Sequence, residues 1–438
     1  MSSSAAGSSL NKPGFYGWKL VVVVFIVYLL NTAFPYYGGS VLNAVMAEDL
    51  GFSRSALGYG FSAFILCMGL TSPMVGVLVN KLGVRKTLFI GGLVLTVGAL
   101  SMAALTATEL QYWLFFGGIS GLGFSLGGVI PVQSVVTYWF KRRKPLAMSV
   151  VLCASGVGSI LSIPILNNIV ASFDGDWRMG WYFVAFTSAL SAFIALIWVR
   201  NKPGDLGQEP DGGAQSVSEV SDTKARPGAV PVYQSAVSWN TADAFRTRAS
   251  WLIVAAACAY TMVFNVCIAH GVVHLRDQGI DDAMTANSVG LLIMSSIIGR
   301  LACGTVGGRI EPRLIWSGGL LALAAGLFVL SITTANWQVY VYALCAGIGF
   351  GASYVSMANI MGNYFGPDSF APLLGVLTTV TCVVGALSPA LAGISYDQLG
   401  GYEPAFNTFI GLALITSVGI ALAHPPRRDR ATTVSNSP

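Results

Sequence analysis

Apolar stretches of spanning length recur along the whole chain, and short polar stretches separate them. An α-helix needs roughly 20 mostly apolar residues to cross the hydrocarbon core of a bilayer. The apolar residues show no sustained alternation with polar ones, so membrane-spanning strands are not expected. The pattern predicts twelve spanning helices, at residues 17–41, 55–79, 86–107, 111–138, 145–171, 180–199, 250–275, 285–307, 313–333, 337–364, 370–396 and 402–423.

One polar stretch, residues 200–249, interrupts this pattern near the middle of the chain. It is rich in Gly, Pro, Ser and charged residues and holds no long apolar run, which is typical of a linker. The pattern therefore predicts five parts: an N-terminal tail (1–16), a six-helix bundle (17–199), a linker (200–249), a second six-helix bundle (250–423) and a C-terminal tail (424–438).

The two halves repeat each other. The fourth and tenth predicted helices each carry a Gly-x-Gly-Phe sequence followed at equal spacing by an aromatic pair: Gly121 to Phe124 with Tyr138-Trp139, and Gly347 to Phe350 with Tyr364-Phe365. Parallel six-helix repeats with a substrate site between them are one known plan of secondary transporters. The repeat therefore favours a transporter.

Composition agrees with lipid as the solvent for most of the chain. The sequence is 54% hydrophobic and 10% charged, whereas a soluble domain has about 25% charged residues. The net charge of +5 comes from basic residues dispersed at the ends of apolar stretches, so nucleic acid is not an expected partner. The seven cysteines lie inside apolar stretches without a CxxC or Cys/His cluster, so we expect neither disulfides nor a metal or cofactor.

The polar loops alternate in charge. The basic loops and the C-terminal tail contain Lys81, Arg85 and Lys86; Lys141 to Lys144; Arg309 and Arg313; and Arg427, Arg428 and Arg430. The loops between them are acidic or neutral. Because Lys and Arg accumulate on the cytoplasmic side, both termini are expected in the cytoplasm. The expected location is the plasma membrane, or the bacterial-type inner membrane if the protein is prokaryotic.

The loop between the second and third predicted helices carries a family resemblance. It reads Gly76-Val-Leu-Val-Asn80-Lys81-Leu-Gly83-Val-Arg85-Lys86. Together with twelve helices in two halves, it resembles the G-x-x-x-D-R-x-G-R-[RK] loop of the major facilitator superfamily. The resemblance implies an all-α membrane fold of two pseudo-symmetric six-helix bundles, a monomer, alternating access, and a conformational role for this loop. Asn80 stands where the family has aspartate, which weakens the implied charge contact with the neighbouring helix.

Three further features resemble the monocarboxylate and oxalate/formate group of that superfamily. They are Phe15-Tyr16-Gly17-Trp18-Lys19, then Ala154-Ser-Gly156-Val-Gly158 followed by Asp176-Trp177-Arg178, and the arginine of Gly299-Arg300-Leu-Ala-Cys-Gly304. This resemblance implies that the transported substrate is a small organic anion.

Arg300 is the one deep cation in the predicted spans, and no Asp or Glu lies well inside any of them. It stands ~12 Å from the predicted end of its helix at ~1.5 Å per residue, which is near the middle of a ~30 Å core. Intramembrane arginines are costly and usually functional. A guanidinium matches a carboxylate in bidentate geometry, so we hypothesise that Arg300 binds the anion. The alternative is a snorkelling arginine, or one that donates to backbone carbonyls.

Several aromatic and amide side chains are further candidates for substrate binding. Phe350 and Tyr354 lie four residues apart and share a helix face, and the resemblance implies an aromatic pair in the substrate cavity. It also implies substrate-contacting tyrosines in the first helix, where the candidates are Tyr28, Asn31 and Tyr36. Ordinary packing and an interfacial aromatic belt remain alternatives for these residues.

Two more candidates lie in the seventh predicted helix. Histidine titrates near neutral pH, so His270 is the obvious intramembrane proton acceptor and a candidate for proton coupling. A helix-packing histidine is the alternative. His274, beside Arg276 and Asp277, is expected to be solvated. Asn265 either lines the pathway or holds helices together.

Two departures from the resembled group narrow the expected substrate. Residues 372–396 contain no Lys or Arg, whereas oxalate/formate exchangers have a lysine in that helix, and Ser296 replaces an aspartate of animal monocarboxylate carriers. One cation favours a monoanion such as lactate or pyruvate, moved with a proton or a counter-anion, or by uniport. The alternative is an exporter of drugs or other non-anionic solutes, which usually holds a buried carboxylate. No catalytic constellation points to an enzyme.

Overall fold

The computed structural model describes residues 14–213, 232–235 and 239–426, and nearly all of these residues are helical. No strand occurs within the described ranges. Twelve described helices are long and apolar enough to cross a membrane, which confirms the predicted fold class; they cover Gly17–Leu50, Ser55–Leu82, Val84–Leu105, Glu109–Trp139, Lys144–Ser172, Trp177–Trp198, Arg248–Asp277, Asn287–Val306, Pro312–Ser331, Asn336–Phe365, Pro367–Leu399 and Glu403–Ala421.

Several helices continue beyond the predicted ends of the spans. The first span runs to Leu50 rather than to residue 41, and the eleventh runs over Pro367–Leu399 rather than 370–396. The apolar pattern marks only the part of a helix inside the hydrocarbon, whereas the helix itself ends at a residue that breaks it. Gly51 and Gly400 end these two helices in the left-handed conformation, which glycine adopts without strain.

In the first half, two spans are built from several segments. The first span joins α1 (Gly17–Thr32), a π-helical turn η1 (Ala33–Gly38) and α2 (Gly39–Leu50); the fourth joins α5 (Glu109–Tyr112), a π-helical stretch η2 (Trp113–Ser120), α6 (Gly121–Gly127) and α7 (Val129–Trp139). The other spans of this half are α3 (Arg54–Leu82), α4 (Val84–Leu105), α8 (Lys144–Ser172) and α9 (Trp177–Trp198). Pro35 lies in η1, where its missing N–H weakens the helical hydrogen bonding.

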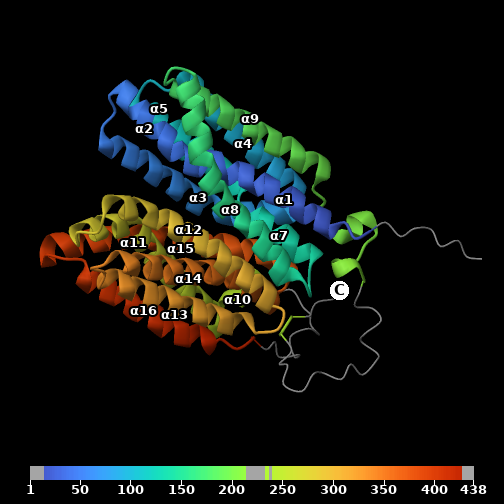
Figure 1. Cartoon of the computed structure of the whole chain (residues 1–438). Coiled ribbons are helices and arrows are strands. Elements are labelled where there is room, and N and C mark those ends of the chain that lie inside the picture. Colours follow the sequence, from blue (N-terminus) through green and yellow to red (C-terminus); the bar gives the residue numbers. More distant parts are fainter. Residues whose placement is uncertain (1–13, 214–231, 236–238, 427–438) are drawn as a thin grey trace, which may run out of the picture.

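In the second half, each span is one helix: α11 (Arg248–Asp277), α12 (Asp282–Val306), α13 (Pro312–Ser331), α14 (Asn336–Phe365), α15 (Pro367–Leu399) and α16 (Glu403–Ala421). The described parts of the linker hold the short helices η3 (Pro203–Leu206), η4 (Pro210–Gly213) and α10 (Thr241–Phe245). The linker lies at the end of the molecule where α1 begins (Figure 1), and we call this the linker end.

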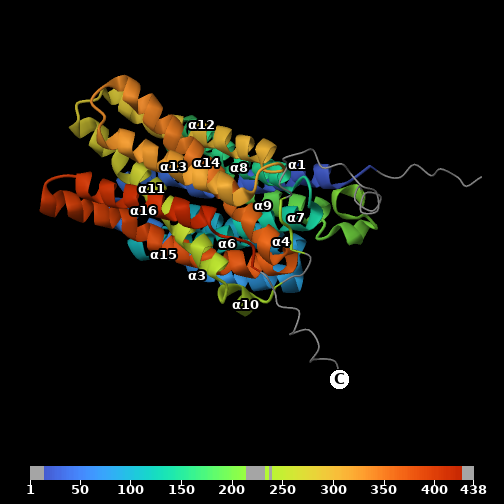
Figure 2. The ribbon, with the colours of Figure 1, turned by 90° about the horizontal axis from the view of Figure 1, so that it is seen from below.

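The two six-helix bundles lie side by side and meet along two seams (Figures 1 and 2). At one seam α3 contacts α15, and at the other α8 contacts α12. Glycines bring the backbones of α3 and α15 close together: a Cβ atom on Gly76 would lie 2.5 Å from the carbonyl oxygen of Ala371, and one on Gly375 would lie 2.5 Å from that of Ser72. Small residues permit this close packing of helices in membranes.

Candidate functional site

Arg300 of α12 reaches across a seam from the second half into the first. Its side chain is buried, with 4% exposure. Nη1 donates to the carbonyl oxygen of Leu152 (2.5 Å) and to Oγ of Ser155 (2.8 Å), both on α8. The guanidinium also lies 5.8 Å from the ring centre of Phe350 and 5.3 Å from that of Tyr354 on α14. Arg300 therefore contacts two other helices, α8 of the first half and α14 of the second, and does not extend to the surface.

The charge of Arg300 has no acidic partner among the described residues. The ion pairs that the structure shows there all join partly or well exposed side chains, and none includes Arg300. Its Nε is buried and makes no hydrogen bond with any described residue. Both hydrogen bonds of the guanidinium come from Nη1, and both acceptors are neutral oxygens. A guanidinium has five N–H donors, so most of them have no acceptor in the described part of the chain. An anion beside Arg300 would supply both the missing acceptors and the missing charge.

Aromatic rings form one side of this site. Phe350 and Tyr354 are nearly parallel, with ring centres 5.8 Å apart, and Phe264 of α11 stacks on Phe350 at 3.6 Å. The hydroxyl of Tyr354 lies 3.4 Å from the hydroxyl of Tyr28 on α1. The structure thus brings Arg300, Phe350, Tyr354 and Tyr28 together, with residues from both halves.

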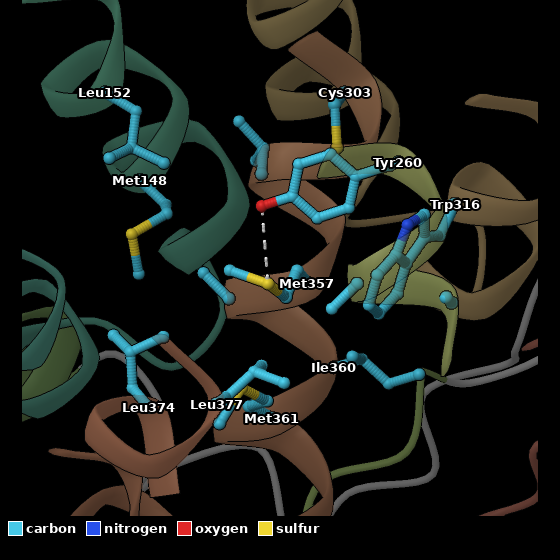
Figure 3. Packing of buried hydrophobic residues seen from close by; sticks show 14 of the residues in the cluster. Met148, Leu152, Tyr260, Cys303, Trp316, Met357, Ile360, Met361, Leu374 and Leu377 are labelled. Atoms are coloured by element: carbon cyan, nitrogen blue, oxygen red, sulfur yellow. Dashed lines mark hydrogen bonds between the residues drawn. The ribbon is translucent and has the colours of Figure 1, made fainter. Parts of the chain in front are cut away.

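A buried apolar layer separates Arg300 from the linker end. Figure 3 shows side chains of this layer from three helices: Met148 and Leu152 of α8, Met357 and Met361 of α14, and Leu374 and Leu377 of α15. Leu152 is the residue whose carbonyl binds Arg300, and Met148 lies one turn nearer the linker end. These buried side chains therefore occupy the level between Arg300 and the linker end.

Tyr36 lies apart from the Arg300 group. Its ring packs against Tyr37 and against Phe61, Phe64 and Phe124 of the first half, with ring centres 5.0–5.7 Å apart. The ring is only partly buried. These contacts place Tyr36 in an aromatic cluster of its own half, and its role in substrate binding stays a prediction.

Asn31 and Asn265 each bind a backbone carbonyl that lacks its helical donor. Asn31 Nδ2 donates to the carbonyl oxygen of Gly127 (3.0 Å), where α6 ends before the non-helical Gly128. A proline cannot donate to the carbonyl four residues before it. Asn265 Nδ2 donates to the carbonyl oxygen of Gly385 (3.0 Å), four residues before Pro389. These contacts favour the helix-to-helix role for both amides, because polar side chains can satisfy such carbonyls inside a membrane.

His270 and His274 belong to α11 and face α15, α13 and the start of α16. The ring nitrogens of His270 contact the hydroxyl of Tyr402 (3.2 Å) and the carbonyl oxygen of Pro389 (2.9 Å). The prediction that His274 is solvated is wrong: it is 5% exposed, and its Nε2 lies 3.1 Å from the carbonyl oxygen of Leu330. Tyr402 and Phe406 pack against the His274 ring, and these residues exclude water from it.

The last turns of α3 contact the other half at the linker end. Asn80 Nδ2 donates to the carbonyl oxygen of Asp368 (2.9 Å), and its Oδ1 accepts from the hydroxyl of Tyr138 (3.2 Å). A hydrogen bond thus stands where the family resemblance implied a charge contact. Arg85 donates through Nε to the carbonyl of Leu196 within the first half, and Lys81 is exposed. Gly83 takes a φ of 83° between the two helices.

Sequence reasoning did not single out Ser155 or Lys144. Ser155 lies inside the Ala154-Ser-Gly156 motif, and that motif was the available signal. Lys144 was counted among the loop cations, although it is 4% exposed and donates through Nζ to Oδ1 of Asn363 in the other half. Its position just before Pro145 was a signal that it begins a helix, since proline is favoured in the first turn.

Comparisons with known proteins agree with this architecture. The sequence profile of the Major Facilitator Superfamily matches residues 20–389 and, in a second match, 252–437. Monocarboxylate transporter 2 of Homo sapiens is 22% identical over 419 residues (94% of this chain, 86% of the relative), and monocarboxylate transporter 3 of Rattus norvegicus is 26% identical over 404 residues (90% and 76%).

Two solved structures share the fold. The human organic anion transporter MFSD10 superposes with a TM-score of 0.67 at 18% identity, covering 94% of this chain and 100% of that one. The E. coli fucose:proton symporter FucP superposes with a TM-score of 0.70 at 12% identity, covering 93% and 98%.

Proposed function

This chain belongs to the major facilitator superfamily, and we propose that it moves a small organic anion, most simply a monocarboxylate such as lactate or pyruvate, by alternating access. Members of this family are multi-pass membrane transporters rather than enzymes, and they carry small molecules. The proposal concerns the substrate and the residue that holds it. Relatives named monocarboxylate transporters support the substrate class.

The observation that carries the proposal is the buried, unpaired charge of Arg300 at the seam of the two halves. Nη1 binds only a carbonyl and a hydroxyl, and Nε has no partner. A carboxylate can accept two parallel hydrogen bonds from a guanidinium and cancel its charge. Because Arg300 belongs to the second half and its oxygen partners to the first, an anion here would respond to movement of one half against the other.

The surroundings of Arg300 suit a compact monoanion. Phe350 and Tyr354 offer flat apolar faces to a short carbon chain, and the hydroxyls of Tyr28 and Tyr354 could donate hydrogen bonds to it. No Lys or Arg occurs at residues 372–396 of α15. A dicarboxylate would therefore find one guanidinium for two negative charges, which favours a monocarboxylate.

We further propose that the linker end faces the cytoplasm of a plasma membrane. The basic loop residues Lys81, Arg85 and Lys141 lie at that end, and positive charge accumulates on the cytoplasmic side. The protein would work there as a monomer, and a proton or a counter-anion would accompany the substrate in symport or antiport.

The test is uptake into proteoliposomes that contain the purified protein. Radiolabelled lactate, pyruvate, formate and oxalate are compared, each with and without a pH gradient. We expect uptake of one or more monocarboxylates, little uptake of oxalate, and loss of uptake in Arg300→Ala. Stimulation by an inward proton gradient identifies symport, and stimulation by unlabelled anion inside the vesicles identifies exchange.

Two controls separate the anion site from general damage. Arg309→Ala removes an exposed cation at the linker end and should leave uptake unchanged. Arg300→Lys keeps the charge but loses the bidentate geometry, so we expect weaker substrate binding with a higher KM. Wild-type uptake by Arg300→Ala protein at normal reconstitution, or transport of a neutral analogue such as lactamide at the rate of lactate, would refute the proposal.

A further inference from the structure

Lys144 is a second buried cation at the contact between the two halves. It begins α8, and its side chain is 4% exposed. Nζ donates to Oδ1 of Asn363 (2.5 Å) and lies 3.4 Å from the carbonyl oxygen of Asn359, both on α14 in the other half. Both acceptors are neutral, and no ion pair of the described chain includes Lys144. Like Arg300, Lys144 is a charge removed from water without an opposite charge beside it.

A pocket of about 470 Å³ lies beside this ammonium at the linker end. Lys144 and Asn363 line it together with Lys141, Lys202 and Asp368. Its walls come from both halves and from the linker. A volume of this order falls within the range of small-molecule sites, so a compact anion fits.

The charge of the pocket lining is positive when the described residues are counted. Lys202 pairs with Asp368 at 3.5 Å, which cancels one lysine against the one aspartate among the described lining residues. Of these residues, Lys141 and Lys144 remain. The nearby Asp211 carboxylate is engaged by backbone N–H groups of Lys141 (2.9 Å) and Arg142 (2.7 Å), so it does not neutralise the ammonium of Lys144 directly. An anion would therefore be attracted into the pocket.

Lys144 and the oxygen partners of Arg300 lie on the same helix. Lys144 precedes Leu152 by eight residues of α8, which corresponds to ~12 Å along the axis. The apolar layer of Met148, Leu374 and Leu377 lies between these two levels. The contact between the two halves thus carries a buried cation at each of these two levels, with buried apolar side chains between them.

Resting on the proposed function, we propose that the pocket at the linker end is a second anion-binding site, where Lys144 holds the carboxylate of the substrate before it reaches Arg300 or after it leaves. The carboxylate takes the place of Asn363 as the partner of the ammonium. Because Asn363 belongs to the other half, binding at this site removes one contact that holds the linker end closed. The site therefore couples arrival of the anion to separation of α8 from α14.

The experiment measures occupancy of the pocket directly. Gly204 lines the pocket and is exposed, and a Cβ atom there would meet no other atom within 4 Å, so Gly204→Cys introduces a reporter thiol without strain. Purified protein in nanodiscs is labelled with a maleimide, and mass spectrometry quantifies the peptide that carries the reporter. We expect lactate to slow its labelling several-fold and lactamide, which has no charge, to leave it unchanged.

Variants assign this protection to Lys144. Protection should persist with Arg300→Ala and disappear with Lys144→Met, whereas Lys141→Met, which removes an exposed lysine of the same lining, should weaken it only slightly. Asn363→Asp keeps Lys144 but gives it a permanent carboxylate, so protection should also disappear there, even if Lys144→Met fails to fold.

Each outcome bears on one proposal. Protection that survives both Lys144→Met and Asn363→Asp, or that vanishes with Arg300→Ala, overturns the second site. If lactate uptake depends on Arg300 but lactate never changes labelling, the second site fails and the proposed function stands. If none of the tested monocarboxylates is transported or protective, the proposed function itself fails.

Discussion

Asn80 of α3 donates a hydrogen bond of 2.9 Å to the backbone carbonyl of Asp368 in α15. That carbonyl lies four residues before Pro372, which has no N–H to offer it. The Asn80 side chain in the first half therefore donates the hydrogen bond that Pro372 cannot donate in the second half. This explains how Asn80 can serve the contact although it lacks the charge of the family's aspartate.

A second hydrogen bond of this kind joins α3 and α15, with the donor and acceptor helices exchanged. Pro73 of α3 leaves the carbonyl of Gly69 without its helical donor, and Thr379 of α15 donates its hydroxyl to that carbonyl at 2.6 Å. Each helix thus offers a freed carbonyl that the other satisfies. When the halves separate at this seam, both carbonyls lose these partners, so the bonds favour the arrangement in which α3 and α15 are in contact.

We expect Thr379→Val to loosen this seam. Side-chain hydrogen bonds between membrane helices average about 0.6 kcal/mol, which corresponds to roughly a threefold change in an equilibrium between two states. Cys382 packs against Gly69 one turn away and is partly buried, so it serves as a native reporter. Its modification by a thiol reagent should become about threefold faster by the same estimate.

The proline provides the control for this prediction. Pro73→Ala restores a backbone N–H that can bind the Gly69 carbonyl within α3, so that carbonyl no longer depends on Thr379. The effect of Thr379→Val should therefore shrink in a Pro73→Ala background. Equal effects in the two backgrounds would show that the freed carbonyl does not contribute to the seam.

Asn265→Ala should lower stability and leave substrate affinity nearly unchanged. The Gly385 carbonyl, freed by Pro389, would lose its donor from α11 and keep the hydroxyl of Ser388 in its own helix (2.8 Å), and a side-chain hydrogen bond between membrane helices contributes about 0.6 kcal/mol. Thermal unfolding in detergent and the KM for lactate uptake measure the two effects. Pro389→Ala should rescue the stability of Asn265→Ala. A raised KM without loss of stability would instead place Asn265 in the substrate path.

The spanning helices could be predicted from the sequence because each satisfies its own backbone inside lipid. The length and apolar composition of a segment therefore decide whether it forms a spanning helix, and both can be read from that segment alone. The extension of the first span to Leu50 was missed because those residues leave the apolar pattern while remaining helical. The π-helical turn at Pro35 follows from proline chemistry, but η2 contains no proline, and we find no comparable local signal for it.

The site was predicted only in part because its residues depend on contacts distant in the sequence. Arg300 stands out since a deep cation is rare, and its aromatic neighbours share a helix face. Asn31 and Asn265 resembled pathway residues because an amide inside a span has the same appearance whether it binds a substrate or a carbonyl. The residues whose carbonyls they bind, Gly127 and Gly385, lie 96 and 120 residues away in the chain. Spacing along one helix cannot show such a pairing.

Ser155→Asp should abolish anion transport while the protein remains folded. Ser155 Oγ lies 2.8 Å from Arg300 Nη1, so a carboxylate at this position can pair with the guanidinium permanently. It would compete with the substrate for the same charge. Uptake of lactate and thermal stability are measured together.

Ser155→Asn is the matched control, because it offers a neutral oxygen of similar reach and should retain substantial uptake. Undiminished uptake by Ser155→Asp would contradict the role of Arg300.

His270→Gln tests the remaining candidate for proton coupling. A carbonyl oxygen only accepts hydrogen bonds, so Nε2 of His270 donates to Pro389, and Nδ1 of the neutral ring can accept from the hydroxyl of Tyr402. A glutamine amide can make the same two contacts without titrating.

These contacts favour a helix-packing role for His270. We therefore expect His270→Gln to keep both lactate uptake and its dependence on pH, and His270→Ala to lose thermal stability because both contacts disappear. The measurement is the pH–rate profile of uptake at equal reconstitution. If His270→Gln flattens that profile while the protein stays as stable as wild type, the histidine carries the proton, because titration is the property of the imidazole that glutamine does not reproduce.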